Sequence, residues 1–169
     1  EFTSLNIDYG HEGELKAAVP DLPLDHFAIG WTGQIEIKEE GEYTFSTYSD
    51  DGSFLWVDDL LVVDNGGLHA PEEKLGSLVL TSGLHDVKIR FFEKQGGAVC
   101  VVKYSGADTG DAMQLLSGFH AGAEPESQVT KYEPVRSLEE SEGLVEGFDG
   151  KYFIMGDEIK DMPDLDVLP

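Results

Sequence analysis

Hydrophobic and polar residues alternate in short runs over the first two thirds of the chain. The run GEYTFSTYS places Tyr43 and Phe45 on one face, and WTGQIEI forms another short run. A period of two residues predicts β-strands, and the glycine-centred turns between the runs predict hairpins. Further strands are predicted in SFLWVDDLLVV, on both sides of the turn TSG in GSLVLTSGLHDVKIRFFE, and in AVCVVKYS. Because no long stretch has a period of 3.6 residues, the pattern predicts an all-β, antiparallel sandwich or barrel.

The pattern changes near residue 120. Residues 120–147 are polar, glutamate-rich and contain two prolines, as is typical of a linker. Residues 148–169 carry apolar residues again. A shift of 143 residues aligns them with the start of the chain, so that a Pro-Asp-Leu tripeptide in one segment falls on the same tripeptide in the other. We therefore expect a β-domain over residues 3–119, an acidic linker over 120–147 and the start of a second copy over 148–169.

The alternative is that the tail closes the first domain and that the echo is accidental. In either case its apolar residues are expected to dock, on this domain or on a neighbour, as an added strand. The first two residues resemble a cloning remnant and are left out of the domain.

The charge of the chain narrows the classes of partner. Lys and Arg total 11 against 34 Asp and Glu, a formal net charge of −23. This argues against nucleic acid and anionic lipid as partners, since both need clustered basic residues, and it is compatible with cation binding. No apolar run is long enough to span a membrane, so we expect no direct membrane insertion. The single cysteine, Cys100, lies in a strand pattern and is interpreted as a small buried hydrophobic residue.

Several short motifs follow one another in a fixed order. They are Trp-x-Gly from Trp31, Gly-x-Tyr-x-Phe from Gly41, Ser-Asp-Asp-Gly from Ser49, Leu-Trp-Val-Asp from Leu55, Leu-x-x-Gly-x-His from Leu80, and Phe-Phe-Glu followed by Gly-Gly-Ala from Phe91. In this order they resemble the protective-antigen (PA-fourteen) domain family, named for anthrax protective antigen and shared with yeast flocculins and epithelial adhesins. The resemblance covers residues 5–119. It implies an antiparallel β-sandwich of the protective-antigen type, and many members of the family bind glycans through calcium.

The resemblance places a calcium site at the Ser-Asp-Asp-Gly motif. In lectin-like members an Asp pair joined by a cis peptide bond turns both carboxylates the same way and holds calcium, which prefers oxygen ligands. Flocculins complete the shell from a later loop with an Asn and two backbone carbonyls, whereas this chain has Glu93 at the Asn position. The extra charge favours metal affinity and leaves less room for a sugar. The predicted metal ligands are Asp50, Asp51, Glu93, Gln95 and Gly97, with Gly52 allowing close backbone approach.

The function implied is a calcium-dependent, lectin-like, carbohydrate-binding adhesion module of a cell-surface or secreted protein. Because the site is acidic, neutral sugars are favoured, on a glycan or glycoprotein. The residues predicted to bind ligand are Asp50, Asp51, Asn65, His69 and Lys94. The alternative is a non-enzymatic protein-interaction or assembly domain of a surface complex, with a surface protein as partner and calcium in a structural role. Catalytic motifs are absent from the sequence, so we expect no enzyme.

The remaining prominent residues receive structural interpretations. The second Asp pair, Asp58-Asp59, is assigned to a turn, and His85 to a structural role beside another turn. Trp31 and Trp56 are predicted to be core aromatics. The segment DAMQLLSGF, residues 111–119, is predicted to form a short helical turn.

Overall fold

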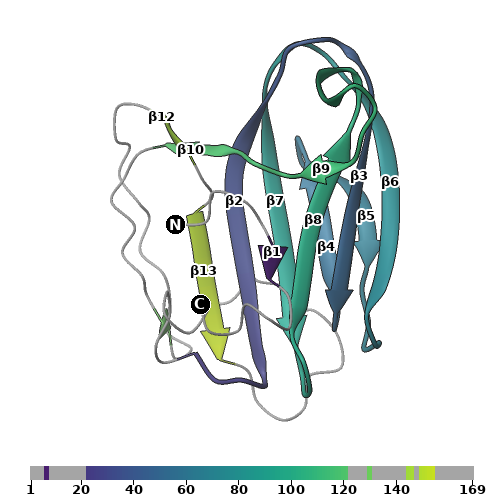
Figure 1. The fold of residues 1–169 in the computed structure, drawn as a ribbon. Helices are drawn as coiled ribbons and strands as arrows, with labels where there is room; N and C mark the ends of the chain where they lie inside the picture. The colour runs from purple at the N-terminus through teal and green to yellow at the C-terminus, as the bar shows by residue number, and fades with distance from the viewer. Residues whose placement is uncertain (1–5, 8–21, 122–128, 131–143, 147–148, 155–169) are drawn as a thin grey trace.

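The computed structural model describes residues 6–7, 22–121, 129–130, 144–146 and 149–154, and these form a β-sandwich (Figure 1). Apart from one turn of 3-10 helix at Ala107–Thr109, the regular elements of this part of the chain are strands. The strands are β1 Asn6–Ile7, β2 Phe27–Ile37, β3 Gly41–Asp50, β4 Ser53–Val57, β5 Leu60–Asn65, β6 Glu72–Leu80, β7 Gly83–Glu93, β8 Val99–Ser105, β9 Gln114–Leu115, β10 Phe119–Ala121, β11 Val129–Thr130, β12 Leu144–Glu146 and β13 Asp149–Ile154.

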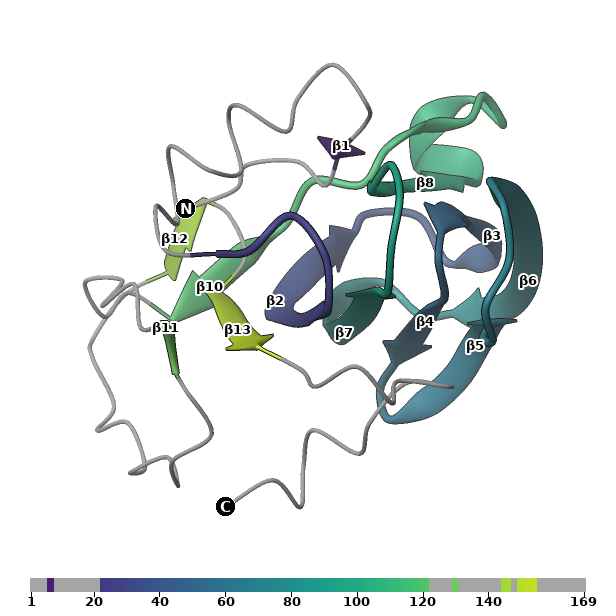
Figure 2. The ribbon, with the colours of Figure 1, turned by 90° about the horizontal axis from the view of Figure 1, so that it is seen from below.

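Two sheets make up the layers of the sandwich. One has the order β1-β8-β3-β6, with β9 paired to β8. The other has the order β11-β13-β2-β7-β4-β5, with β10 joining β2 to β12. The long pairings are antiparallel, above all β2 with β7 and β3 with both β6 and β8. Figure 2 shows the layers from one end, and the predicted antiparallel β-sandwich is confirmed.

The core lies between the layers because one face of each long strand is apolar. Tyr43 and Phe45 of β3 point inward together, as their spacing predicted, and Trp31 of β2 is fully buried with them. Cys100 is also fully buried, which raises the pKa of its thiol to about 12 and keeps it protonated. The prediction for Trp56 is wrong. This residue alternates with buried Leu55 and Val57, so it lies half-buried on the outer face of β4.

On that outer face Trp56 has one aromatic and one cationic neighbour. Its ring stacks on Phe54, with ring centroids 5.8 Å apart, and the guanidinium carbon of Arg90 lies 5.4 Å from the Trp56 ring centroid. The prediction for residues 111–119 is also wrong. Gln114 and Leu115 form β9 against β8 instead of a helical turn.

Much of the predicted linker and tail lies outside the described residues, so the division into two copies stays a prediction. Within the tail, β13 pairs antiparallel with β2 from Asp149 opposite Thr32 to Ile154 opposite Phe27. Figure 1 shows β13 alongside β2. The tail therefore adds a strand to this sheet, as its apolar content led us to expect.

One crossing between the sheets positions the candidate site. β3 belongs to the first sheet and β4 to the second, and only Asp51 and Gly52 separate them. The same end of the sandwich collects the end of β7, the start of β2 and the β5–β6 connection, as the strand pairings require. None of the described residues forms a helix of the length and hydrophobicity needed to cross a membrane.

Candidate metal centre

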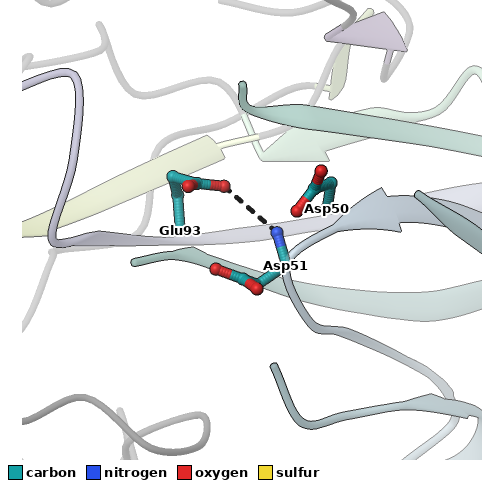
Figure 3. Close-up of side chains that lie close together, drawn as sticks. All are labelled: Asp50, Asp51 and Glu93. Carbon is teal, nitrogen blue, oxygen red and sulfur yellow. Dashed lines mark hydrogen bonds between the residues drawn. The ribbon is translucent and has the colours of Figure 1, made fainter. Parts of the chain in front are cut away.

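Three carboxylates gather where β3 and β7 end. Asp50 is the last residue of β3, Asp51 follows it, and Glu93 is the last residue of β7. One oxygen from each lies within 4.8 Å of the others, and the peptide bond between Asp50 and Asp51 is cis. Asp51 is 7% exposed, Glu93 is fully buried and Asp50 is half-buried. Figure 3 shows the three side chains close together, so the structure brings three of the predicted metal ligands to one place.

Gly52 brings the neighbouring segments close to this pair. A Cβ atom at Gly52 would lie 2.4 Å from Cε1 of Phe92 and 2.8 Å from the carbonyl oxygen of Gly67. The Gly52 carbonyl accepts a hydrogen bond from the Phe92 backbone N–H at 3.0 Å. Only glycine fits here without displacing backbone, as the sequence analysis proposed.

Asp51 joins two loops through its carboxylate. Its Oδ1 accepts the backbone N–H of His69 at 3.1 Å, and its Oδ2 accepts that of Lys94 at 2.9 Å. The backbone N–H of Asp51 donates to Oε2 of Glu93 at 3.1 Å (Figure 3). Asp51 thus holds the β5–β6 connection and the β7–β8 connection against the end of β3.

Glu93 is the most perturbed acid in the site. Burial disfavours its ionised form, and the negative charges of Asp51, Asp50 and Asp25 act in the same direction. The hydrogen bond from the Asp51 N–H opposes them but does not compensate. Together these effects raise the pKa of Glu93 from 4.5 to about 8. A divalent cation beside the three carboxylates would reverse the balance by favouring their ionised forms.

The donor set fits a hard cation. Oε1 of Glu93 is buried and has no hydrogen-bond partner among the described residues, although buried polar atoms are normally satisfied. Calcium binds six to eight oxygen ligands and accepts carboxylates in one- or two-oxygen modes. Asp50, Asp51 and Glu93 would hold it, and the bound ion would offer its remaining positions to hydroxyl or carbonyl oxygens.

The other predicted ligands lie in the two loops that Asp51 holds. Gln95 is exposed and Gly97 half-buried in the β7–β8 connection, so their carbonyls stay predicted metal ligands. Lys94 meets Asp51 through its backbone N–H, and His69 does the same from the β5–β6 connection.

Asn65 differs from the other predicted ligand-binding residues because its side chain points into the domain. It is 1% exposed, and Nδ2 donates to Oγ of Ser49 at 3.0 Å and to the carbonyl of Glu72 at 3.0 Å. Ser49 belongs to a buried hydroxyl cluster with Ser53 and Thr47. Direct contact of Asn65 with ligand stays a prediction, whereas its role in shaping the loop follows from these bonds.

A fourth segment at the site is missing from the sequence prediction. Asp25 accepts the backbone N–H of Gly96 through Oδ1 at 3.2 Å, and the His26 N–H donates to the Lys94 carbonyl at 3.1 Å. His26 has a positive φ of 59°, which lets the chain turn into β2 at this point. The only sequence signal was an Asp-His pair just before the Trp-x-Gly strand, and such pairs are too common to indicate a site.

The family follows from a profile comparison. The profile of the PA14 domain matches residues 16–111, which are 96 of the 169 residues. This chain belongs to the PA14 domain family. The family expected from the order of motifs is therefore confirmed, and the Asp50–Asp51 pair lies inside the matched PA14 region.

The proteins that this PA14 domain resembles include anti-sigma factors and an adhesin. Anti-sigma-I factor RsgI3 of Acetivibrio thermocellus is 30% identical over 107 residues, which are 62% of this chain and 17% of that protein. A solved anti-sigma factor domain-containing protein is 25% identical with a TM-score of 0.57, over 67% of this chain and 38% of the other. The PA14 sugar-binding domain from an RTX adhesin shares the fold, with 24% identity and a TM-score of 0.52, over 68% of this chain and 70% of the other. The chain thus spans less than two fifths of either anti-sigma protein.

Proposed function

We propose that this PA14 domain binds calcium between Asp50, Asp51 and Glu93 and uses the bound ion to bind neutral sugars. The carrying observation is the convergence of three carboxylates, two of them buried and one half-buried, at the end of the sandwich, where one of the buried acids has an unsatisfied oxygen. Buried acids of like charge are unfavourable together unless a cation or protons neutralise them. A calcium ion leaves one net negative charge, which disfavours acidic sugars.

The surrounding loops would select among sugars. The β5–β6 connection, the β7–β8 connection and the segment around Asp25 surround the carboxylates and meet through backbone hydrogen bonds. Sugar binding is also the property named for the RTX adhesin domain, which supports this proposal through the shared fold alone. We place the activity on a cell-surface or secreted protein, without catalysis.

Calcium uptake is the first test of the proposal. Titration calorimetry of the metal-stripped protein should show one calcium bound, and Asp50→Asn should reduce the affinity because one charged ligand is lost. Asp59→Asn is the matched control, since Asp59 belongs to the other Asp pair and is 95% exposed in a turn. Equal calcium affinity for the wild type and Asp50→Asn would refute the assignment of the ligands.

A glycan array is the second test. Metal-loaded protein should bind neutral glycans, and EDTA or Asp50→Asn should abolish the signal. Protein shown to be calcium-loaded that binds no glycan would refute the lectin function while leaving the metal site intact.

The likeness to two anti-sigma proteins favours a second candidate. In this candidate the domain is a protein-interaction module of a regulatory or surface protein, and calcium only fixes the loops. Capture of a specific protein partner that free sugars do not displace, together with an array without signals, would support it.

A further inference from the structure

The loop between β5 and β6 carries a histidine that holds the loop closed. Nε2 of His69 lies 3.0 Å from the carbonyl oxygen of Asn65, and Nδ1 lies 3.0 Å from the carbonyl oxygen of Ala70. The ring donates to one of these carbonyls in either neutral tautomer and to both when doubly protonated. One tautomer thus ties the loop back to Asn65, the last residue of β5, and the doubly protonated ring bonds both ends of the Asn65–Ala70 segment.

The loop contains a segment whose backbone is permissive, between the Gly66 N–H that Asp64 accepts and the His69 N–H that Asp51 accepts. Gly66 and Gly67 are adjacent, and Gly67 has a φ of 92°, a conformation that glycine adopts freely. Leu68 is 43% exposed and is absent from the core cluster. Asn65, by contrast, is anchored by the two N–H groups of its side-chain amide, which donate to Oγ of Ser49 and to the carbonyl of Glu72, both at 3.0 Å. The histidine ring connects the permissive segment to this fixed residue.

The same residue reaches the metal centre through its backbone. The His69 N–H donates to Oδ1 of Asp51, whose other oxygen receives the Lys94 N–H. Fixing the ring between two carbonyls fixes the position of the N–H, and the N–H orients the Asp51 carboxylate. Nothing in this arrangement requires the His69 ring itself to touch a metal ion or a sugar.

We infer that His69 is a positioning residue: its ring closes the Asn65–Ala70 loop and thereby sets the Asp51 carboxylate for calcium. This inference rests on the proposed function. Outer-shell groups that orient metal ligands are commonly worth about 10- to 100-fold in metal affinity. Here the contribution passes through one backbone N–H, so the lower end of that range is expected.

The variants are His69→Ala and His69→Gln, with His85→Ala as the matched control. His85 also has both ring nitrogens within hydrogen-bond distance of an acceptor, Asp58 at 2.6 Å and the Thr81 carbonyl at 2.9 Å, but it lies at the opposite end of the sandwich. His69→Ala should raise the calcium dissociation constant about tenfold, with little change in the calcium-free melting temperature. His69→Gln, which keeps a side-chain N–H donor, should recover part of the loss. His85→Ala should lower the melting temperature and leave calcium affinity unchanged.

A readout without metal separates this inference from the proposed function. In the calcium-free protein, backbone amide exchange at Leu68, His69 and Ala70 should become faster in His69→Ala and stay the same in His85→Ala. Unchanged calcium affinity in His69→Ala, when the wild type binds calcium, overturns the positioning role alone. Unchanged amide exchange overturns the loop closure. Absence of calcium uptake by the wild type overturns the proposed function, and the positioning role with it.

Discussion

At the scale of single residues, Glu93 combines its proposed role as a calcium ligand with a cost to the calcium-free fold. Its pKa of about 8, against 4.5 for an unhindered glutamate, means that the folded state keeps a proton that the unfolded chain releases. Stability of the calcium-free protein therefore falls as the pH rises from about 4.5 to about 8, and it loses nothing further from this group above that range.

Glu93→Gln should remove this penalty, because glutamine resembles the protonated acid and carries no charge. We expect a higher melting temperature for the calcium-free variant at pH 7, a larger gain at pH 8, and much weaker calcium binding. Thermal melts between pH 5 and 9 with EDTA, and calorimetry with calcium, measure both effects. Glu42→Gln, at an exposed position at the other end of β3, is the control. A variant that melts below the wild type throughout would contradict the electrostatic account.

His85 predicts a pH effect of similar direction at the far end of the domain. Burial by itself disfavours the imidazolium, but the hydrogen bonds to Asp58 and to the Thr81 carbonyl, with the charges of Asp58 and Asp86, outweigh it and raise the pKa of His85 above 6.5. The stabilisation is thus fully present below pH 6.5 and is lost as the pH rises through the higher folded-state pKa. In Asp58→Asn, the melting temperature should therefore fall less with rising pH above pH 6 than it does in the wild type. An unchanged dependence of the melting temperature on pH would show that Asp58 does not stabilise the protonated form of His85.

The residues of the site were predictable to different degrees. Asp50, Asp51 and Glu93 stood out because their motifs and order matched a family. Asp25 did not, because its place beside Gly96 depends on the left-handed turn at His26, which no local pattern signals. The inward orientation of Asn65 depends on acceptors in two other strands, Thr47 and Ser49 of β3 and Glu72 of β6, so no local pattern separated it from the other predicted ligand-binding residues.

At the scale of the elements, Gly76 marks a close approach between β5 and β6, strands of different sheets. A Cβ atom at Gly76 of β6 would lie 1.8 Å from the carbonyl oxygen of Val62 in β5. Glycine here lets the two layers meet along this edge of the sandwich.

Gly76→Ala should therefore push β5 and β6 apart. Because the clashing atom is backbone, the cost should be about 1–3 kcal/mol, as for an overpacked core. Chemical denaturation measures it. Gly41→Ala is the control, since a Cβ atom at Gly41 would meet nothing within 4 Å. Equal stability of the two variants would mean that the sheets separate at no cost.

The strand pattern was largely predictable, and its failures share a cause. Alternation identified β2, β3, β6, β7 and β8. The Asp58-Asp59 pair was assigned to a turn because such pairs form turns, and both residues have positive φ between β4 and β5. Alternation could not tell that the alternating aromatic in β4 faces outward, because both faces of that strand carry large apolar residues. The partners of Trp56 on the outer face, Phe54 and Arg90, compensate for this exposure.

At the scale of the whole molecule, the buried core that the structure describes is drawn from residues ahead of the predicted linker. Its members run from Leu22 to Leu116, whereas β13 contributes a strand to the edge of β2. We expect a chain ending at Gly122 to stay folded and to bind calcium, with lower stability because β2 loses its pairing with β13 while keeping β7. Thermal melts and calcium titration of the shortened chain test this. Unfolding would assign the tail to this domain and contradict a second copy.

The position of the carboxylates at the crossing of the sheets has a mechanical consequence. Asp50 ends a strand of one sheet and Glu93 ends a strand of the other, so an ion between them ties both layers together at one end. A tethered ligand pulling on that ion would load β3 and β7 along their lengths. In this shear direction the long ladders, eleven paired positions between β2 and β7 and nine between β3 and β6, resist together instead of opening one bond at a time. A sugar bound through calcium, as proposed, would therefore be held against tension by both sheets.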